Sequence, residues 1–181
     1  NIVHRDLKPD NIFLARDENG HDYIKILDFG VAKFIDAQAM SGKTKVGSIL
    51  GTPWYMPPEQ CKGSLSVDLR SDIYALGCVF YQMVCGKVPF SGSLRDVLIA
   101  QIHKDPAPPR SLNPDCPPEI EALILQMMAK EPAGRPSSMG AIATTLDAFV
   151  EPAPVRDPAD RRAQQVAPRQ QTPQQPYPTP V

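Results

Sequence analysis

The segment that most constrains the fold is an apolar run from Ile73 to Tyr81, which only Gly77 interrupts. It lies within SDIYALGCVFYQMVCG, which is apolar on nearly all sides and stops at Gly86, as a buried helix commonly does. The run is far shorter than the ~20 residues needed to span a bilayer. We therefore predict a buried central helix.

Three further segments have the spacing or capping signals of helices. SLRDVLIAQIHK opens with Ser93 as an expected N-cap and has Asp96 three residues later. PEIEALILQMMAK and SSMGAIATTLDAFV repeat apolar residues at the spacing of one buried face. The apolar positions that we expect to pack are Leu94, Val97, Leu98, Ile102, Ile120, Leu123, Ile124, Met127, Met128, Met139, Ile142, Leu146 and Phe149.

Two short apolar runs near the start, 12–14 and 23–27, predict strands. Between them Asn19-Gly20 is a strong hairpin signal, so the strands are expected to pair antiparallel. Residues 31–58 are small, polar and charged and end in Pro57-Pro58, which is typical of a long mobile loop. The predicted fold class is α+β, mainly helical with a short β-hairpin.

The composition changes after residue 150. Residues 151–181 hold eight prolines and six glutamines and almost no large apolar residues. Such a segment buries too little surface to offset its ordering entropy. We predict one domain over 1–150 and a Pro/Gln-rich disordered linker or tail over 151–181; a proline-rich ligand for another domain is the alternative.

The charged residues are nearly balanced. The chain has 19 basic and 20 acidic residues and a formal net charge of −1, which gives no global reason to expect nucleic acid or a membrane surface as partner. No signal peptide is visible at the N-terminus. The four cysteines lack metal-ligand spacing and are expected as thiols of a cytoplasmic protein, with structural disulfides as the alternative.

The stretch HRDLKPDN, residues 4–11, gathers groups that suit phosphoryl transfer. This reaction needs a positioned hydroxyl, a held metal ion and neutralised phosphate charge. Asp6 is a carboxylate that accepts a hydroxyl proton, Lys8 supplies a cation, and the amide oxygen of Asn11 suits Mg²⁺, a hard cation. A second carboxylate, Asp28 in DFG, is expected to return beside Asn11 because the hairpin folds the chain back.

Five motifs occur in one order: HRDLKPDN, DFG, GTPWYMPPE, SDIYALG and RPS. They resemble the protein kinase motif set, and residues 1–150 are similar to the C-terminal lobe of a eukaryotic-like, bacterial serine/threonine kinase. The resemblance implies a protein-kinase-like fold and transfer of the ATP γ-phosphoryl group, with Mg²⁺, to Ser and Thr hydroxyls of protein substrates. In similar bacterial kinases such a tail often leads to a membrane anchor, here beyond residue 181.

The resemblance also implies a role for each motif residue. Asp6 would be the catalytic base, and Lys8 would contact the transferred phosphate of ATP. Asn11 and Asp28 would hold Mg²⁺, and Phe13 would form part of the floor beneath adenine. The other implied roles are Thr52 bonding toward Asp6 and Lys8 and favouring Ser or Thr substrates, His4 and Phe29 in a buried stack, Asp72 anchoring the catalytic-loop backbone, and Glu59 paired with Arg135.

Each of these structural roles has a plainer alternative. Asp72 could merely cap the helix that follows Ser71, and Glu59 and Arg135 could be solvated surface charges. The ordered set of motifs favours the kinase roles. One departure from the family pattern is Pro57, which stands where alanine is usual and is expected to stiffen the substrate-binding turn.

Arg5, within the catalytic loop, leads to a hypothesis of control by phosphorylation. A phosphothreonine carries about −1.5 to −2 charges and can order a loop against cationic groups. Thr44 is the first candidate acceptor, followed by Ser48 and Ser41. Lys33 would join Arg5 in binding the phosphate.

Parts of a complete kinase do not occur in this sequence. The Gly-rich phosphate loop, the strand lysine and its helix glutamate are missing before His4, and the glycines and lysines of SGKTKVGS lie after DFG. We therefore expect a fragment of an active kinase without its N-terminal lobe, inactive as an isolated chain. The alternatives are a non-catalytic kinase-lobe binding module and a degraded gene product.

Overall fold

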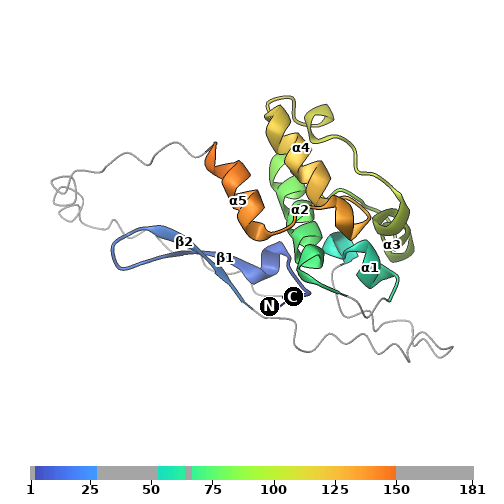
Figure 1. Ribbon diagram of the computed structural model, residues 1–181, viewed down its shortest axis with the longest axis horizontal. Helices are drawn as coiled ribbons and strands as arrows, with labels where there is room; N and C mark the ends of the chain where they lie inside the picture. The colour runs from blue at the N-terminus through green and yellow to red at the C-terminus, as the bar shows by residue number, and fades with distance from the viewer. Residues whose placement is uncertain (1–2, 28–52, 64–66, 150–181) are drawn as a thin grey trace, which may run out of the picture. The chain divides into compact units, whose positions relative to one another are not determined.

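The computed structural model of the 181-residue chain describes residues 3–27, 53–63 and 67–149. These residues all lie in one compact unit, Asn1–Phe149. They are mostly helical and include a two-stranded antiparallel sheet (Figure 1). Both features agree with the prediction of a mainly helical fold with a short β-hairpin. Among the described helices, none is long and apolar enough to cross a bilayer.

Helix α2, Leu69–Cys85, is the predicted buried helix, and nine of its 17 residues are buried. It begins two residues before the predicted start because the side chain of Asp68 accepts a hydrogen bond from the Arg70 N–H and caps it. It ends at Gly86, which adopts φ +70°, a left-handed conformation that favours glycine.

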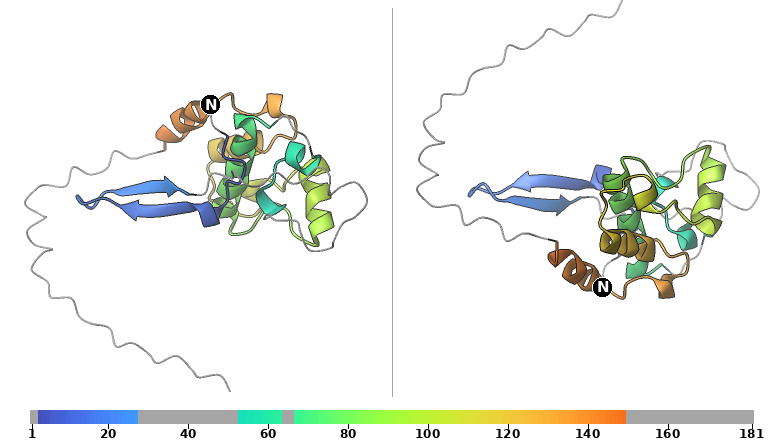
Figure 2. Two further views of the ribbon diagram at one scale, coloured as in Figure 1. Left: turned by 90° about the horizontal axis from the view of Figure 1, so that it is seen from below. Right: turned by 90° about the horizontal axis from the view of Figure 1, so that it is seen from above.

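Helix α4, Pro118–Met127, packs along α2 (Figures 1 and 2). The two helices approach closely at Gly77, where an added Cβ would lie 2.9 Å from the Cβ of Met127 and 3.1 Å from the Cγ of Met128. Both methionines are buried, as the apolar spacing predicted. The core of the described residues therefore lies where α2 meets α4.

Helix α3, Leu94–His103, and helix α5, Met139–Asp147, begin at serine caps. The predicted cap of α3 is confirmed, since Ser93 and Asp96 form a reciprocal capping box. The predicted packed faces are only partly right. Leu94 and Met139 are the first residues of their helices and Phe149 lies two residues beyond α5, and all three are more than a third exposed.

Strands β1, Ile12–Arg16, and β2, Asp22–Ile26, pair antiparallel with Ile12 opposite Ile26. At the turn between them the Gly20 N–H donates to the Asp17 carbonyl at 3.0 Å, and Gly20 adopts φ +82°, which glycine tolerates best. The predicted hairpin at Asn19-Gly20 is confirmed, although β1 runs two residues further than expected. Figure 2 shows the two strands leading away from the helices as a ribbon.

Part of the predicted loop 31–58 is instead ordered and packed. A 3₁₀ turn, η3 (Pro53–Tyr55), is followed by the short helix α1, Pro58–Cys61. Pro53 and Tyr55 are buried because η3 packs against both α2 and α3, and burial of apolar area is favourable. The rest of that loop and the predicted tail lie outside the described residues. The other 3₁₀ turns are η1 (Pro9–Asn11), η4 (Pro109–Ser111) and η5 (Pro132–Gly134).

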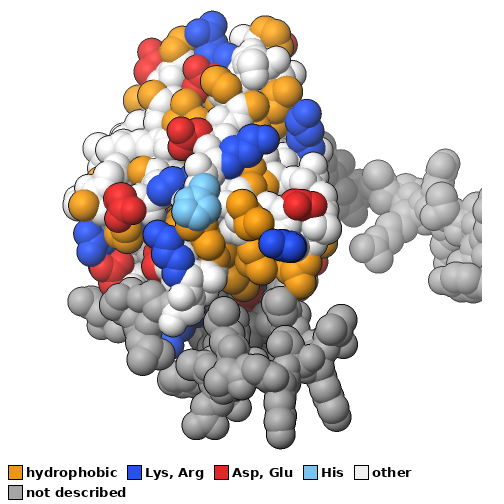
Figure 3. All heavy atoms as spheres, turned by 90° about the vertical axis from the view of Figure 1, so that its right-hand side faces the viewer, with side chains coloured by type: hydrophobic (Ala, Val, Ile, Leu, Met, Phe, Trp, Pro, Cys, Tyr) orange, Lys and Arg blue, Asp and Glu red, His pale blue; other side chains and the backbone are white. Residues whose placement is uncertain are grey.

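All four cysteines, Cys61, Cys78, Cys85 and Cys116, are free thiols, as expected. Burial raises the pKa of Cys61 and of Cys78 to about 12, so both thiols stay protonated near neutral pH. On the face that carries α3, basic and acidic side chains are interspersed with apolar ones (Figure 3). This mixture fits the near balance of charges in the sequence.

Candidate active site

The turn from His4 to Asn11 brings three polar side chains together. The Lys8 Nζ lies 3.3 Å from the Asp6 Oδ2, and both side chains are less than a fifth exposed. The Asn11 Nδ2 donates to the Asp6 carbonyl at 2.8 Å and approaches the Asp6 Oδ2 at 3.4 Å. The 3₁₀ turn η1 closes the loop and buries Asn11. A carboxylate, a cation and an amide therefore share one partly buried place.

The amide of Asn11 is oriented by these contacts. Because its Nδ2 donates to Asp6, the Oδ1 is the atom left to bind a cation, and amide oxygen is a suitable ligand for Mg²⁺. Asp28, the other predicted ligand, lies outside the described residues. Leu27, which directly precedes Asp28 in the sequence, donates its N–H to the Asn11 carbonyl at 2.9 Å. Within the described residues no three His, Cys, Asp or Glu side chains form a metal cluster.

The imidazole of His4 joins the turn of residues 4–11 to the end of β2. Its Nδ1 accepts a hydrogen bond from the Asp6 N–H at 3.3 Å. The Nε2 lies 3.1 Å from the Leu27 carbonyl and must donate there, since a carbonyl only accepts. This pattern fits a neutral imidazole protonated on Nε2. Phe29, the predicted stacking partner of His4, lies outside the described residues.

The carboxylate of Asp72 joins the same loop to α2. Its Oδ2 accepts from the His4 N–H at 2.7 Å, and its Oδ1 accepts from the Arg5 N–H at 2.9 Å. Burial raises the pKa of Asp72 above its ordinary value, and these two hydrogen bonds oppose that rise. Because Asp68 is the residue that caps α2, helix capping does not explain Asp72.

Arg5 has a strained backbone. Its φ of +66° is the only positive value among the described non-glycine residues. A non-glycine residue held in such a conformation costs about 1–3 kcal/mol and persists only where neighbours impose it. Here the N–H of Arg5 is held by Asp72, and its carbonyl accepts from the Gln60 Nε2 at 3.3 Å. Helices α1 and α2 together fix the loop.

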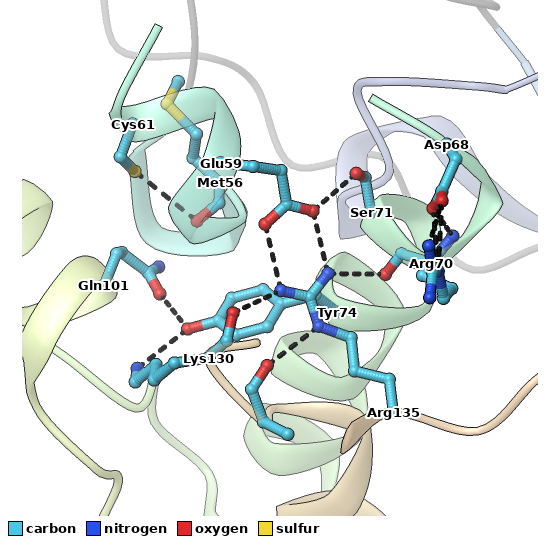
Figure 4. Close-up of polar contacts among 11 residues, drawn as sticks. Met56, Glu59, Cys61, Asp68, Arg70, Ser71, Tyr74, Gln101, Lys130 and Arg135 are labelled. Carbon is cyan, nitrogen blue, oxygen red and sulfur yellow. Dashed lines mark hydrogen bonds and ion pairs between the residues drawn. The ribbon is translucent and has the colours of Figure 1, made fainter. Parts of the chain in front are cut away.

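Glu59 of α1 and Arg135 form a buried, two-pronged ion pair (Figure 4). The Arg135 Nη1 and Nη2 lie 2.8 and 2.9 Å from the two carboxylate oxygens, and the guanidinium side chain is fully buried. Burial pushes the pKa of Glu59 upward, but hydrogen bonds from Arg135 and Ser71 outweigh it and leave that pKa lowered. The alternative of solvated surface charges is wrong. The remaining guanidinium N–H bonds go to the carbonyls of Arg70, Ala129 and Lys130.

The other predicted site residues lie elsewhere in the described residues or outside them. Phe13 lies on β1 and is about half exposed. Arg5 has an exposed side chain, and Pro57 is the N-cap residue of α1. The predicted residues that lie outside the described residues are Asp28, Phe29, Lys33, Ser41, Thr44, Ser48 and Thr52.

Sequence reasoning missed three residues that form a second polar cluster: Tyr74, Gln101 and Lys130. The Tyr74 hydroxyl donates to the Gln101 Oε1 at 2.6 Å, and Lys130 Nζ lies 3.1 Å from that hydroxyl. One signal was available for Gln101, since it lies four residues after the buried Val97 and so on the same helix face.

The sequence of this chain is similar to those of known proteins. The family model described as "Protein kinase domain" matches residues 1–146. This chain belongs to the protein kinase family. The resemblance inferred from the five motifs is thereby confirmed, and the fold is a protein kinase fold that is mostly helical with a two-stranded antiparallel sheet.

Several bacterial kinases are similar to this chain. The serine/threonine-protein kinase Pkn1 of Myxococcus xanthus is 45% identical over 146 residues, which cover 80% of this chain and 21% of that protein. The kinase pkn3 of the same organism is 40% identical over 166 residues, covering 90% and 30%. PknB of Mycolicibacterium smegmatis is 38% identical over 135 residues, covering 74% and 21%. The chain thus spans a fifth to a third of the length of these relatives.

Proposed function

We propose that this protein is a serine/threonine kinase that transfers the γ-phosphoryl group of ATP to Ser and Thr hydroxyls of protein substrates. Residues 1–150 are then the C-terminal lobe of the kinase domain, and 151–181 a linker or tail. The observation that carries the proposal is the cluster of Asp6, Lys8 and Asn11, held from α2 by Asp72.

In this proposal each member of the cluster has one task. Asp6 accepts the proton of the attacking hydroxyl, and Lys8, at 3.3 Å from it, contacts the transferred phosphate. Asn11 and Asp28 are the residues that would hold Mg²⁺, which when bound neutralises charge on the phosphates. Phe13 lines the adenine site, and Thr52 favours Ser and Thr acceptors.

A conservative substitution of the base tests the proposal. In the product of the complete gene, Asp6→Asn keeps the size of the side chain and removes the proton acceptor, so turnover should fall by about 10²–10⁴-fold. The matched control is Asp10→Asn, in the same turn but exposed, which should leave turnover unchanged. The assay is transfer of labelled phosphate from MgATP to a serine peptide. Equal turnover of the Asp6 variant and the wild-type protein would show that Asp6 is not the base.

Regulation by phosphorylation is a further part of the proposal. Arg5, whose side chain is exposed beside the cluster, and Lys33 would bind a phosphate on Thr44, with Ser48 and Ser41 as the next candidates. Thr44→Ala should then lower activity after preincubation with MgATP. Mass spectrometry of the preincubated protein identifies the acceptor. A Thr44→Ala variant as active as the wild-type protein would show that Thr44 is not the regulatory acceptor.

A further inference from the structure

A buried glutamine on α3 holds the backbone of the segment that follows Thr52. The Gln101 Nε2 donates to the Trp54 carbonyl at 2.8 Å and to the Pro53 carbonyl at 3.1 Å. Its Oε1 accepts from the hydroxyl of Tyr74, on α2, at 2.6 Å (Figure 4). One side chain thus links α2 and α3 to two successive carbonyls of η3.

Lys130 fixes the direction of these hydrogen bonds. Its ammonium has only donors and lies 3.1 Å from the Tyr74 Oη, so the hydroxyl accepts there and gives its own hydrogen to Gln101. The amide of Gln101 must then turn its Nε2 toward the carbonyls of Pro53 and Trp54, since a carbonyl only accepts. Lys130 also sits over the rings of Phe90 and Tyr74, at 4.6 and 5.5 Å from their centroids. The order Lys130, Tyr74, Gln101, backbone is therefore defined.

A polar amide at this position is unusual, because Gln101 and Tyr74 have no exposed surface. Burying an amide is costly unless all of its hydrogen bonds are made, and an apolar side chain would fill the same place without that cost. What the glutamine does, and an apolar residue does not, is bind the two backbone carbonyls. The polar choice thus points to backbone placement rather than to packing alone.

The backbone held in this way belongs to a segment that is joined to the proposed catalytic loop by one hydrogen bond. Pro53 follows Thr52 directly in the sequence, and the same segment continues to Gln60, whose side chain reaches the Arg5 carbonyl. A shift at Pro53–Trp54 would therefore displace the turn around Pro57, where a protein substrate is expected. ATP, which the proposal assigns to Lys8, Asn11, Phe13 and Asp28, would be little affected.

We propose that Gln101, supported by Tyr74 and Lys130, is a positioning residue that sets the backbone of Pro53–Trp54 for binding of the protein substrate. The inference rests on the proposed kinase function. It makes a selective prediction: loss of the Gln101 contacts weakens use of the peptide substrate and leaves use of ATP unchanged.

The experiment compares two variants in the product of the complete gene. Gln101→Met keeps the length of the side chain and removes its hydrogen bonds, and Tyr74→Phe removes one oxygen from a core ring. The matched control is Gln126→Met on α4, where the glutamine is exposed. KM for MgATP, KM for the peptide and kcat are measured with the best serine peptide found by screening a random library with the wild-type protein.

For each of the two core variants, we expect KM for the peptide to rise about tenfold, the equivalent of one to two net hydrogen bonds, and KM for ATP to stay within about twofold of the wild-type value. The control should match the wild-type protein in all three constants. If the wild-type protein is active and KM for the peptide is unchanged in both variants, the inference about Gln101 is wrong and the proposed function stands. The same holds if only kcat or the folded fraction falls. A wild-type protein that transfers no phosphate, or that is unaffected by Asp6→Asn, overturns the proposed function and this inference with it.

Discussion

The carboxylate of Asp72 accepts a hydrogen bond of 2.7 Å from the backbone N–H of His4, although the two residues are 68 positions apart in the sequence. With its second oxygen it accepts from Arg5, whose backbone is strained. One buried side chain thus holds two successive peptide groups of the proposed catalytic loop. The local preference of Arg5 opposes this backbone shape, because a non-glycine residue at φ +66° is unfavourable.

Asp72→Asn tests this relationship. Asparagine has one acceptor oxygen, so its amide group would face one of the two N–H donors and leave it without a partner. We expect the free energy of unfolding to fall by about 1–3 kcal/mol, the cost of an unsatisfied buried donor. Urea denaturation followed by circular dichroism measures it, and the kinase assay should show lower turnover.

The matched control is Asp68→Asn on the same helix. Asp68 caps α2 from an exposed position, and asparagine caps helices about as well as aspartate. This variant should unfold at nearly the wild-type urea concentration. If the two variants lost the same free energy of unfolding, the prediction that the contacts of Asp72 with His4 and Arg5 stabilise the fold would be wrong.

Glu59→Gln should be costly because it leaves a buried guanidinium without its counter-charge. Breaking a buried pair by removing one partner typically costs about 3–5 kcal/mol, and the Arg135 side chain is fully buried. The pair of Arg16 with Asp22 is exposed and screened by solvent, so breaking it should change the free energy of unfolding little. Arg16→Gln is therefore the control in the same urea titrations, and a similar small loss for both variants would contradict the prediction.

The pH dependence of the Glu59 variant gives a second test. The pKa of Glu59 is lowered in the folded protein, with burial opposed and outweighed by the hydrogen bonds from Arg135 and Ser71. The unfolded chain therefore binds the proton more readily, and the stability from this carboxylate is complete above its ordinary value of 4.5 and is lost as the pH falls through the folded pKa. The difference in the free energy of unfolding between the wild-type protein and Glu59→Gln should therefore become smaller as the pH falls below 4.5. A constant difference would show that the charge of Glu59 is not what stabilises the fold.

Lys130 gives a further test, at alkaline pH. Burial lowers the pKa of its ammonium to about 8 from an ordinary 10.5, with Cys78 and Asp105 acting in the other direction. Between these values the unfolded chain holds the proton and the folded protein has released it, so this group adds stability as the pH rises. Relative to Lys130→Met, the wild-type protein should gain stability from about pH 8 to 10.5.

The measurement is the difference in free energy of unfolding between the two proteins, taken at several pH values in urea. The difference is needed because Cys61 and Cys78, whose pKa values burial raises, lower the stability of both proteins at high pH. A difference that stays flat across the window would mean that Lys130 keeps its proton in the folded protein.

The parts of the fold that the sequence predicts well are those set by neighbouring residues. Gly86 ends α2, Ser93 and Asp96 cap α3, and Gly20 turns the hairpin, and in each case the signal lies within a few positions. The Asp6, Lys8 and Asn11 cluster belongs to the same class, because one tight turn brings these residues together.

What the sequence hides depends on contacts between distant segments. Pro53 and Tyr55 look like loop residues until α2 and α3 cover them, and the polar Gln101 looks like a surface residue until its amide meets two carbonyls of η3. Asp72 is an intermediate case, since only its place in an ordered motif set distinguished it from a helix cap. Polar residues in apolar helices are therefore where single-segment reasoning fails for this protein.

Gly77→Ala gives a test of the packing at the core. Alanine favours a helix interior over glycine by about 1 kcal/mol, but here its Cβ would lie 2.9 Å from the Cβ of Met127 and 3.4 Å from the backbone carbon of that residue. Since α4 cannot retreat without losing core contacts, we expect a net loss of about 1–3 kcal/mol, as for other overpacked cores. The matched control is the variant Gly140→Ala in α5. Its new Cβ would contact only the Ser138 Oγ, at an ordinary van der Waals distance of 3.7 Å. That variant should be neutral or up to about 1 kcal/mol more stable than the wild-type protein. Thermal and urea unfolding measure the free energy of unfolding of both variants. A Gly77→Ala variant more stable than the wild-type protein would mean that α2 and α4 are not in close contact at this position.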